Sequence, residues 1–239
     1  MPAPVTHLEI LGPDRQALAE FYGGVFGWSL TPIDEMNYTL FAAAEGGIGG
    51  GLGKPESGDP SVSVYAEIDD LDAKLALADE LGATDTMGPI PLSPDSRIGM
   101  FRDPAGLVFG LYEGPSDSEE AAKGQGAAVV WFDLIGAPAD TQRDFYAKLL
   151  GWEYEITGDY AHIKKGDRGI AGGITAPMPG MPEKAIVAYI ETPDIDATLS
   201  KIEAAGGRKV LGRTSVGENL AVALFADVAG NLNGLVTRG

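Results

Sequence analysis

The chain has 239 residues, 44% of them hydrophobic, which is enough for one large domain or for two domains that each bury a core. Its 35 acidic residues against 17 basic ones give a formal net charge of −18, so the surface should repel nucleic acid and anionic lipid. Cysteine is absent, which excludes disulfides, thiolate metal sites and cysteine nucleophiles. We therefore expect a neutral or cationic small molecule as the partner, while a salt-adapted or simply very soluble protein would carry the same excess of acid.

The first residues contain no basic segment followed by an apolar one, and no apolar run reaches the roughly 18 residues that a membrane span needs. These features predict a cytoplasmic protein with no membrane partner.

In chain order, alternating residues 6–11 predict a strand, and Asp14 is the expected N-cap of a helix that ends at Gly27. Asp69-Asp70 is the expected cap of a second helix, which ends at Gly82. The remaining runs predict strands at 28–32, 38–43, 48–52, 62–68, 87–92, 98–101 and 107–112. The series is therefore strand, helix and three strands, stated twice.

The whole series recurs after 124 residues, which indicates a duplication. Phe21-Tyr22 corresponds to Phe145-Tyr146, and Gly27-Trp28 to Gly151-Trp152, with an offset of 122 just after the tryptophan. We predict an α+β fold with two tandem domains, each made of two βαβββ modules that form a cupped mixed β-sheet with helices outside. The expected boundaries are 1–114 and 128–239, joined by a linker at 115–127 that is rich in small and charged residues.

Three motifs carry a resemblance to a known family: His7-Leu8-Glu9-Ile10 with Phe21-Tyr22, the run Val64 to Asp72, and Phe101 to Gly106. Together they resemble the glyoxalase, bleomycin-resistance and extradiol-dioxygenase superfamily, also called vicinal oxygen chelate. The resemblance covers nearly the whole chain except the linker. It is greatest to the tandem glyoxalase-like proteins of actinobacteria.

The resemblance implies a divalent metal held by His, Glu or Gln side chains from the first strand and a late strand of each module. The corresponding positions here are His7, one of Gly49 to Gly51, Ser63 and Gly110 in the first copy, and Trp131, Gly172 or Gly173, Val187 and Gly234 in the second. Only His7 is an ordinary ligand, so we expect no metal and no cofactor. We interpret the glycines as space made for a bound molecule.

The candidate ligand-binding residues face the expected concavity: His7, Ser63, Tyr65, Gly110, Tyr112, Trp131, Asp133, Tyr189 and Gly234. His7, Glu9 and Tyr65 are also candidate acid/base groups. Each has a plainer alternative: His7 as a satisfied polar side chain, Glu9 in a structural link, and the aromatic residues as core packing. His162 is expected on a solvated strand face, and the Phe-Tyr pairs with Trp28 and Trp152 in packing between helix and sheet.

These features predict a metal-free small-molecule-binding protein of the glyoxalase/bleomycin-resistance type that sequesters an aromatic or cationic metabolite or antibiotic. The alternative is a metal-independent lyase, isomerase or hydroxylase of secondary metabolism that uses His7, Glu9 and Tyr65. A metal-dependent glyoxalase or dioxygenase is the third reading, and the ligand positions argue against it. The differences between the copies predict some asymmetry, with the first domain as the active one if only one is, in a monomer or a homodimer.

Overall fold

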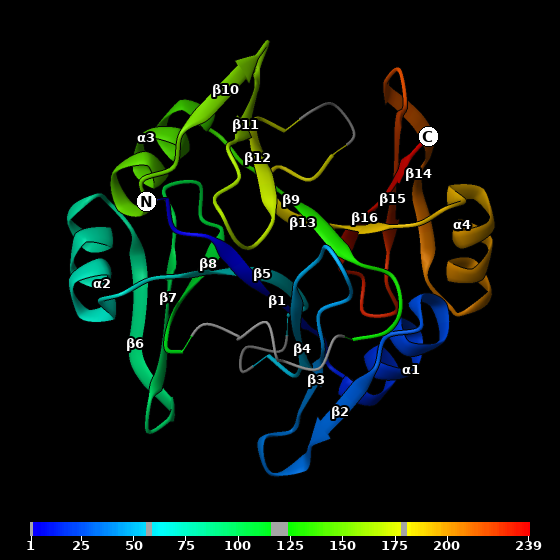
Figure 1. Cartoon of the computed structure of the whole chain (residues 1–239), viewed down its shortest axis with the longest axis horizontal. Coiled ribbons are helices and arrows are strands. Elements are labelled where there is room, and N and C mark those ends of the chain that lie inside the picture. The colour runs from blue at the N-terminus through cyan, green and yellow to red at the C-terminus, as the bar shows by residue number, and fades with distance from the viewer. Residues whose placement is uncertain (1, 56–58, 116–123, 178–180) are drawn as a thin grey trace. The chain divides into compact units, whose positions relative to one another are not determined.

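A computed structural model describes residues 2–55, 59–115, 124–177 and 181–239. The first copy forms one eight-stranded mixed sheet in the order β2-β3-β4-β1-β5-β8-β7-β6 (Figure 1). Its strands are β1 (Val5–Leu11), β2 (Leu30–Ile33), β3 (Tyr38–Phe41), β4 (Gly49–Gly53), β5 (Ser61–Glu67), β6 (Thr84–Ser93), β7 (Ser96–Arg102) and β8 (Val108–Glu113). Helices α1 (Arg15–Phe26) and α2 (Leu71–Glu80) follow β1 and β5, and a short 3₁₀ turn, Asp34–Met36, precedes β3.

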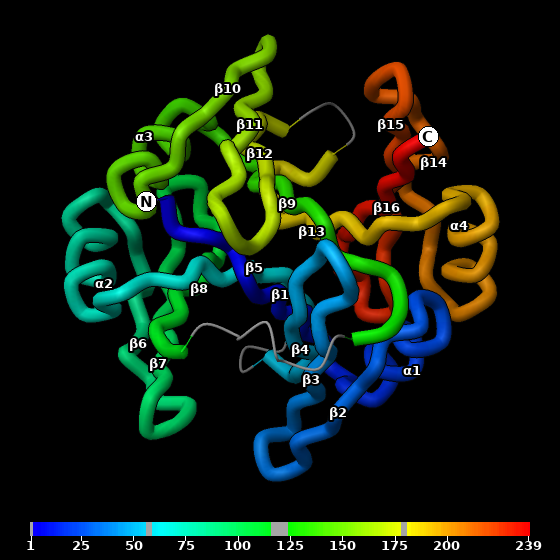
Figure 2. Tube along the Cα trace, in the orientation of Figure 1, coloured from blue at the N-terminus to red at the C-terminus, as the bar shows by residue number. Residues whose placement is uncertain are grey.

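The second copy repeats this order as β10-β11-β12-β9-β13-β16-β15-β14. Its strands are β9 (Val129–Ile135), β10 (Tyr154–Thr157), β11 (Tyr160–Ile163), β12 (Ala171–Thr175), β13 (Ala185–Glu191), β14 (Arg208–Gly217), β15 (Leu220–Ala226) and β16 (Leu232–Arg238). Helices α3 (Ala139–Leu150) and α4 (Ile195–Ala204) take the places of α1 and α2, as the colour change along the tube in Figure 2 lets the reader follow. The predicted α+β duplication of βαβββ modules is confirmed.

Side-chain caps begin three of the helices, for the reason that the sequence predicted. Asp14, Asp70 and Asp194 each accept a hydrogen bond from a backbone N–H of the first turn, and Gly27 ends α1 with φ at 71°. A left-handed residue of this kind costs glycine little and other residues more. The helices predicted from capping signals therefore begin and end close to the expected residues.

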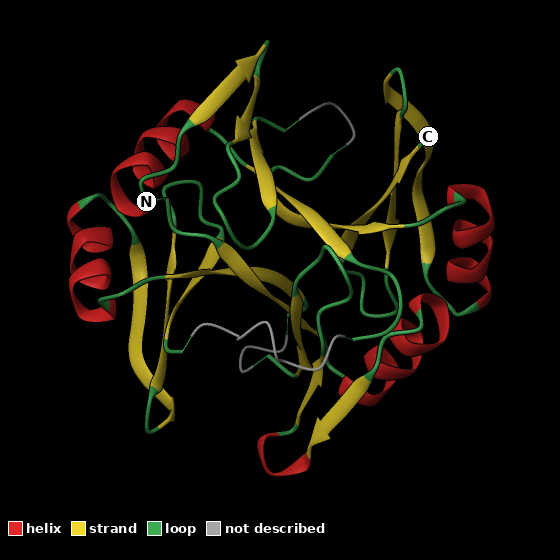
Figure 3. Cartoon of the chain, in the orientation of Figure 1, coloured by secondary structure: helices red, strands yellow, loops and turns green. Residues whose placement is uncertain are grey.

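Contacts divide the chain into two compact units, each of which draws on both copies. One unit holds Met1–His7, Ser63–Ala121 and Phe132–Ile186, and the other holds Leu8–Val62, Ala122–Trp131 and Val187–Gly239. In the first unit α2 packs on β6 and β7 (Figure 3) and also contacts α3, while in the second α1 contacts α4. Each unit thus combines the second module of one copy with the first module of the other. The boundaries 1–114, 115–127 and 128–239 stay a prediction.

Aromatic residues fill the core of each unit between helix and sheet. Tyr22 stacks on Trp28 with ring centroids 4.8 Å apart, and Tyr146 stacks on Trp152 at 5.0 Å. All four side chains are buried. The prediction that these residues pack helix against sheet is confirmed.

A buried aspartate joins each of these aromatic cores to a hairpin. In one unit Asp103 accepts hydrogen bonds from Tyr146 and Gln142, and in the other Asp227 accepts from Tyr22 and Asn231. Both aspartates also accept from two backbone N–H groups of their own hairpin. The tyrosine bond and the two backbone bonds thus recur in both units, while the amide partner comes from α3 in one and from the hairpin itself in the other.

No helix within the described parts of the chain is long and apolar enough to cross a membrane.

Candidate functional site

In the second module of each copy, a tyrosine ring lies over a late-strand glycine, at a position where the resemblance implies a metal ligand. Tyr65 on β5 is the direct parallel partner of Gly110 on β8, and Tyr189 on β13 is that of Gly234 on β16. A Cβ atom on either glycine would lie under 3.0 Å from the tyrosine ring. Both tyrosines are buried, with 3% and 9% of their surface exposed.

The first module of each copy has the same feature, built from a different strand. The ring of Tyr38 on β3 covers Gly51, and the ring of Tyr160 on β11 covers Gly173. Tyr38 donates a hydrogen bond to Glu9 at 3.1 Å, and Tyr160 donates one to Asp133. Burial, and then the adjacent carboxylate, raise the pKa of Tyr38 far above its ordinary value, so this phenol keeps its proton.

These contacts correct one interpretation drawn from the sequence. Gly110 and Gly234 were expected to leave open space for a ligand, and that reading is wrong at the glycines themselves because tyrosine rings occupy the space. The rings put aromatic surface and phenol groups at the positions where the resemblance implies metal ligands.

His7 lies beside Tyr65, a contact that the sequence analysis did not specify. Their rings meet edge to face, with centroids 5.7 Å apart, and Tyr65 donates a hydrogen bond to the Met100 sulfur at 3.2 Å. Ser63, two residues before Tyr65 on β5, is buried. Burial lowers the pKa of His7 from 6.5 to about 4, so its imidazole is neutral near pH 7.

This neutral histidine predicts a stability that depends on pH. The pKa of His7 is lower in the folded chain than the unfolded value of 6.5, so the unfolded chain binds the extra proton first as the pH falls. Stability is therefore full above pH 6.5 and declines toward pH 4, with a loss of about 2 kcal/mol between about pH 7.5 and pH 5.

Urea unfolding at the two pH values measures this loss, and His7→Gln should remove that share of it. His162→Gln, at an exposed strand position, controls for the removal of a histidine as such. An unchanged loss in His7→Gln would contradict the assignment.

The other predicted site residues lie as follows. Trp131 and Val187 replace His7 and Ser63 in the second copy, and the indole is half-buried while Val187 is fully buried. Tyr112 is half-buried and donates a hydrogen bond to the Pro115 carbonyl at 3.2 Å. His162 is exposed, opposite Glu155 on β10, in agreement with the predicted solvated face.

Sequence reasoning missed Tyr38, Tyr160 and Met100. Glu9 was considered only with His7, although it accepts a hydrogen bond from Tyr38. The repeat held a usable signal, because Tyr38 and Tyr160 are related by the same offset of 122 that the loop after Trp28 shows. A tyrosine at equivalent positions in both copies could have been predicted as a site residue together with Glu9 and Asp133.

The residues present do not fit the divalent metal that the superfamily implies. In residues 2–55, 59–115, 124–177 and 181–239, no group of three or more His, Cys, Asp or Glu side chains could hold a metal ion. The late-strand positions are glycines, and the tyrosine rings above them supply no carboxylate or imidazole lone pair.

A family model described as Glyoxalase/Bleomycin resistance protein/Dioxygenase superfamily matches residues 5–111 and 129–235. The chain therefore belongs to this superfamily, with two copies of its domain.

Its curated relatives include two of similar length. A putative glyoxylase CFP32 of Mycobacterium tuberculosis is 27% identical over 210 residues, which cover 82% of this chain and 80% of the relative. The anthracycline biosynthesis protein DnrV of Streptomyces peucetius is 28% identical over 235 residues, which cover 86% and 83%.

Solved structures share the fold at low sequence identity. The 2,3-dioxygenase LapB of Pseudomonas sp. KL28 has a TM-score of 0.72 at 12% identity, covering all of this chain and 93% of that one. The Mn(II)-bound glyoxalase of Novosphingobium aromaticivorans has a TM-score of 0.69 at 13% identity, covering 99% and 82%.

Proposed function

We propose that the chain is a metal-independent small-molecule-binding protein of the glyoxalase/bleomycin-resistance type that sequesters an aromatic or cationic metabolite or antibiotic. The observation that carries this proposal is the tyrosine ring over the late-strand glycine in all four modules. At each of these four positions, where the resemblance implies a metal ligand, glycine stands and a tyrosine ring covers it. The proposal extends to a cytoplasmic protein, monomeric or dimeric, that binds neither nucleic acid nor membrane.

The chemistry of the lining residues favours such a ligand. Tyrosine presents a π face that attracts cations and stacks on aromatic rings, together with a hydroxyl that can orient a polar group. The net charge of −18 raises the local concentration of cationic ligands. The first copy is more polar than the second at two of the predicted site positions. It has His7 and Ser63 where the second copy has Trp131 and Val187.

A metal-independent enzyme of secondary metabolism is the second candidate. A neutral His7 has a lone pair that can accept a proton, although burial lowers its pKa to about 4 and makes it a weak base near pH 7, and it lies against Tyr65, whose phenol is a proton donor. The relatives DnrV and DauV are described as anthracycline biosynthesis proteins. On this candidate His7, Glu9 and Tyr65 would act as acid/base groups in a lyase, isomerase or hydroxylase reaction.

The test has three measurements on the chain purified without chelators. Elemental analysis should find no stoichiometric metal, and native mass spectrometry should be used to look for a co-purified ligand. A thermal-shift screen of aromatic metabolites and cationic antibiotics should give a hit, with about 2.7 kcal/mol of stabilisation at a ligand concentration of 100 Kd.

Tyr65→Ala and Tyr189→Ala should reduce the ligand-induced shift, measured against each variant's own ligand-free midpoint. Tyr154→Ala removes a tyrosine that is bonded to the Arg143 carbonyl instead, and should keep the shift. Stoichiometric, tightly held metal would overturn the proposal. Turnover that disappears in His7→Ala would favour the enzyme.

A further inference from the structure

A groove of about 470 Å³ lies at the start of α4, away from the tyrosine and glycine pairs. The β14–β15 hairpin, the end of β16 and the first turn of α4 line it, with Ile195, Arg213, Ala221, Thr237 and Arg238 among its residues. This volume is within the range of small-molecule sites. Neither the superfamily's ligand positions nor the proposed function uses it.

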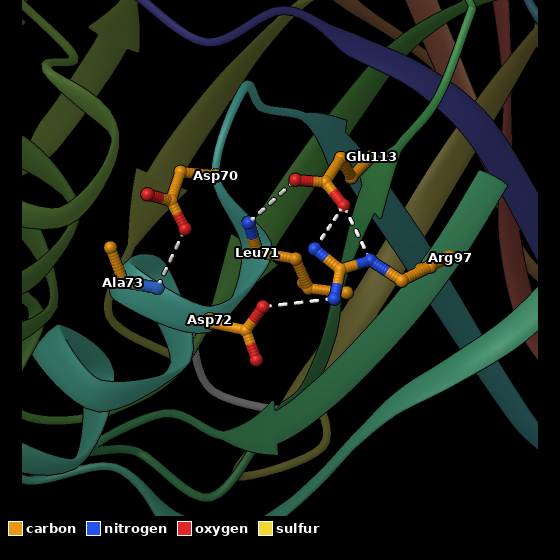
Figure 4. A network of polar contacts seen from close by, with 6 residues as sticks. All are labelled: Asp70, Leu71, Asp72, Ala73, Arg97 and Glu113. Carbon is orange, nitrogen blue, oxygen red and sulfur yellow. Dashed lines mark hydrogen bonds and ion pairs between the residues drawn. The ribbon is translucent and has the colours of Figure 1, made fainter. Parts of the chain in front are cut away.

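In the first copy the same place is filled by the chain's own side chains (Figure 4). Arg97 on β7 donates hydrogen bonds to Glu113 at 2.6 Å and to Asp72 at 2.8 Å. The other Glu113 oxygen accepts a hydrogen bond from the backbone N–H of Leu71, the first residue of α2, at 3.1 Å. A guanidinium and a carboxylate thus lie together over the start of the helix.

The second copy has the same kinds of residue at the start of its helix but no counterpart of the Arg97 and Glu113 side chains. Arg97 and Glu113 are cross-strand partners, and their counterparts Ala221 and Thr237 are paired in the same way. Asp196 takes the place of Asp72, and Ile195 that of Leu71. A small alanine and a threonine therefore replace a pair of opposite charges, and the groove lies where that pair would be.

Charged groups of both signs surround the groove. Asp194 and Glu218 line it together with Arg213 and Arg238, and Arg238 is paired with Glu191 at 3.3 Å. A simple anion would meet the two carboxylates, and a simple cation would meet the two guanidinium groups. A molecule that carries both charges would complement the groove. In the first copy, the Arg97 and Glu113 side chains fill the equivalent place with the same two charges.

We propose that this groove binds a small zwitterion, an α-amino acid or guanidino acid, in place of the missing pair of side chains. Its carboxylate faces the first turn of α4 at Ile195 and the Arg213 guanidinium, and its cationic group faces the carboxylates of Asp194 and Glu218, which line the groove. The first copy supports this chemistry. There the Glu113 carboxylate accepts a hydrogen bond from the backbone N–H of Leu71, and the Arg97 guanidinium donates one to Asp72.

Isothermal titration with L-arginine tests the proposal, with agmatine and glutarate as probes that carry only the cationic or only the anionic part. We expect one site for L-arginine and binding at least about tenfold weaker for either partial probe, the loss expected when one charged contact goes unmade. The double variant Ala221→Arg with Thr237→Glu rebuilds the first copy's network in the second and should abolish binding. Arg213→Glu should also weaken binding. Because Arg213 is exposed, this substitution should not disturb the packing of the core.

The reciprocal variant is the matched control. Arg97→Ala with Glu113→Thr opens the counterpart groove in the first copy, where Pro89 and Pro94 stand at the places of Arg213 and Glu218, and should leave the stoichiometry at one site. The proposal is overturned by no binding to the wild type, by equal binding of agmatine or glutarate, or by unchanged binding in Arg213→Glu. Far-UV circular dichroism verifies the fold of each variant.

Discussion

Asp103→Ala should lower the free energy of unfolding by about 3–5 kcal/mol, because it strands several buried donors at once. One carboxylate oxygen accepts the backbone N–H groups of Ala105 and Leu107, each at 2.9 Å. The other accepts Gln142 at 2.7 Å and the Tyr146 hydroxyl at 3.1 Å. Asp103 has only 3% of its surface exposed, so water cannot replace the lost acceptor.

Chemical denaturation with urea, followed by tryptophan fluorescence, measures this loss. Asp69→Ala, at an exposed position before α2, is the matched control and should change stability by less than about 0.5 kcal/mol. Tyr146→Phe removes a single hydrogen bond from the same network and should cost about 0.5–1.5 kcal/mol. A loss in Asp103→Ala no larger than in Tyr146→Phe would show that the carboxylate does not organise the hairpin.

The position of Asp103 illustrates where sequence reasoning ends. Its motif, Phe101 to Gly106, was recognised as a closing hairpin from residues adjacent in the chain. Its partners Gln142 and Tyr146 lie 39 and 43 residues away in the other copy, and no local pattern connects them. The helix caps at Asp14 and Asp70 were predictable because cap and donor are three residues apart.

The pairing of modules in the two compact units could not be predicted from the sequence either. The repeat predicts four similar modules, and similar modules offer similar faces, so the sequence does not say which two share a core. The structure joins the second module of one copy to the first module of the other. The equivalent bonds of Tyr22 to Asp227 and of Tyr146 to Asp103 show why both units are built in this way.

Only part of the packing around the candidate site residues could be predicted from the sequence. The lack of metal ligands follows from residue identity alone, since glycine offers no side-chain donor. The alternation of β5 placed Ser63 and Tyr65 on one face, and the structure puts His7 against Tyr65. The direction of the tyrosine rings could not be read in the same way, because a rotamer depends on the neighbouring strand. Direct pairing of Tyr65 with Gly110 turns an apparent vacancy into a filled position.

Gly110→Ala should therefore cost about 3 kcal/mol, at the upper end for the insertion of one methyl group into a packed core. The new Cβ would lie under 3.0 Å from the Tyr65 ring, which is itself buried. If that ring is the obstacle, Gly110→Ala should cost little more in a Tyr65→Ala background, and a double-mutant cycle in urea measures the coupling. Gly24→Ala in α1, with nothing within 4 Å of its Cβ, should instead stabilise by about 0.5–1 kcal/mol. Additive costs at Gly110 and Tyr65 would mean that the glycine serves the backbone and not the ring, and would remove the main support for the tyrosines as substitutes for metal ligands.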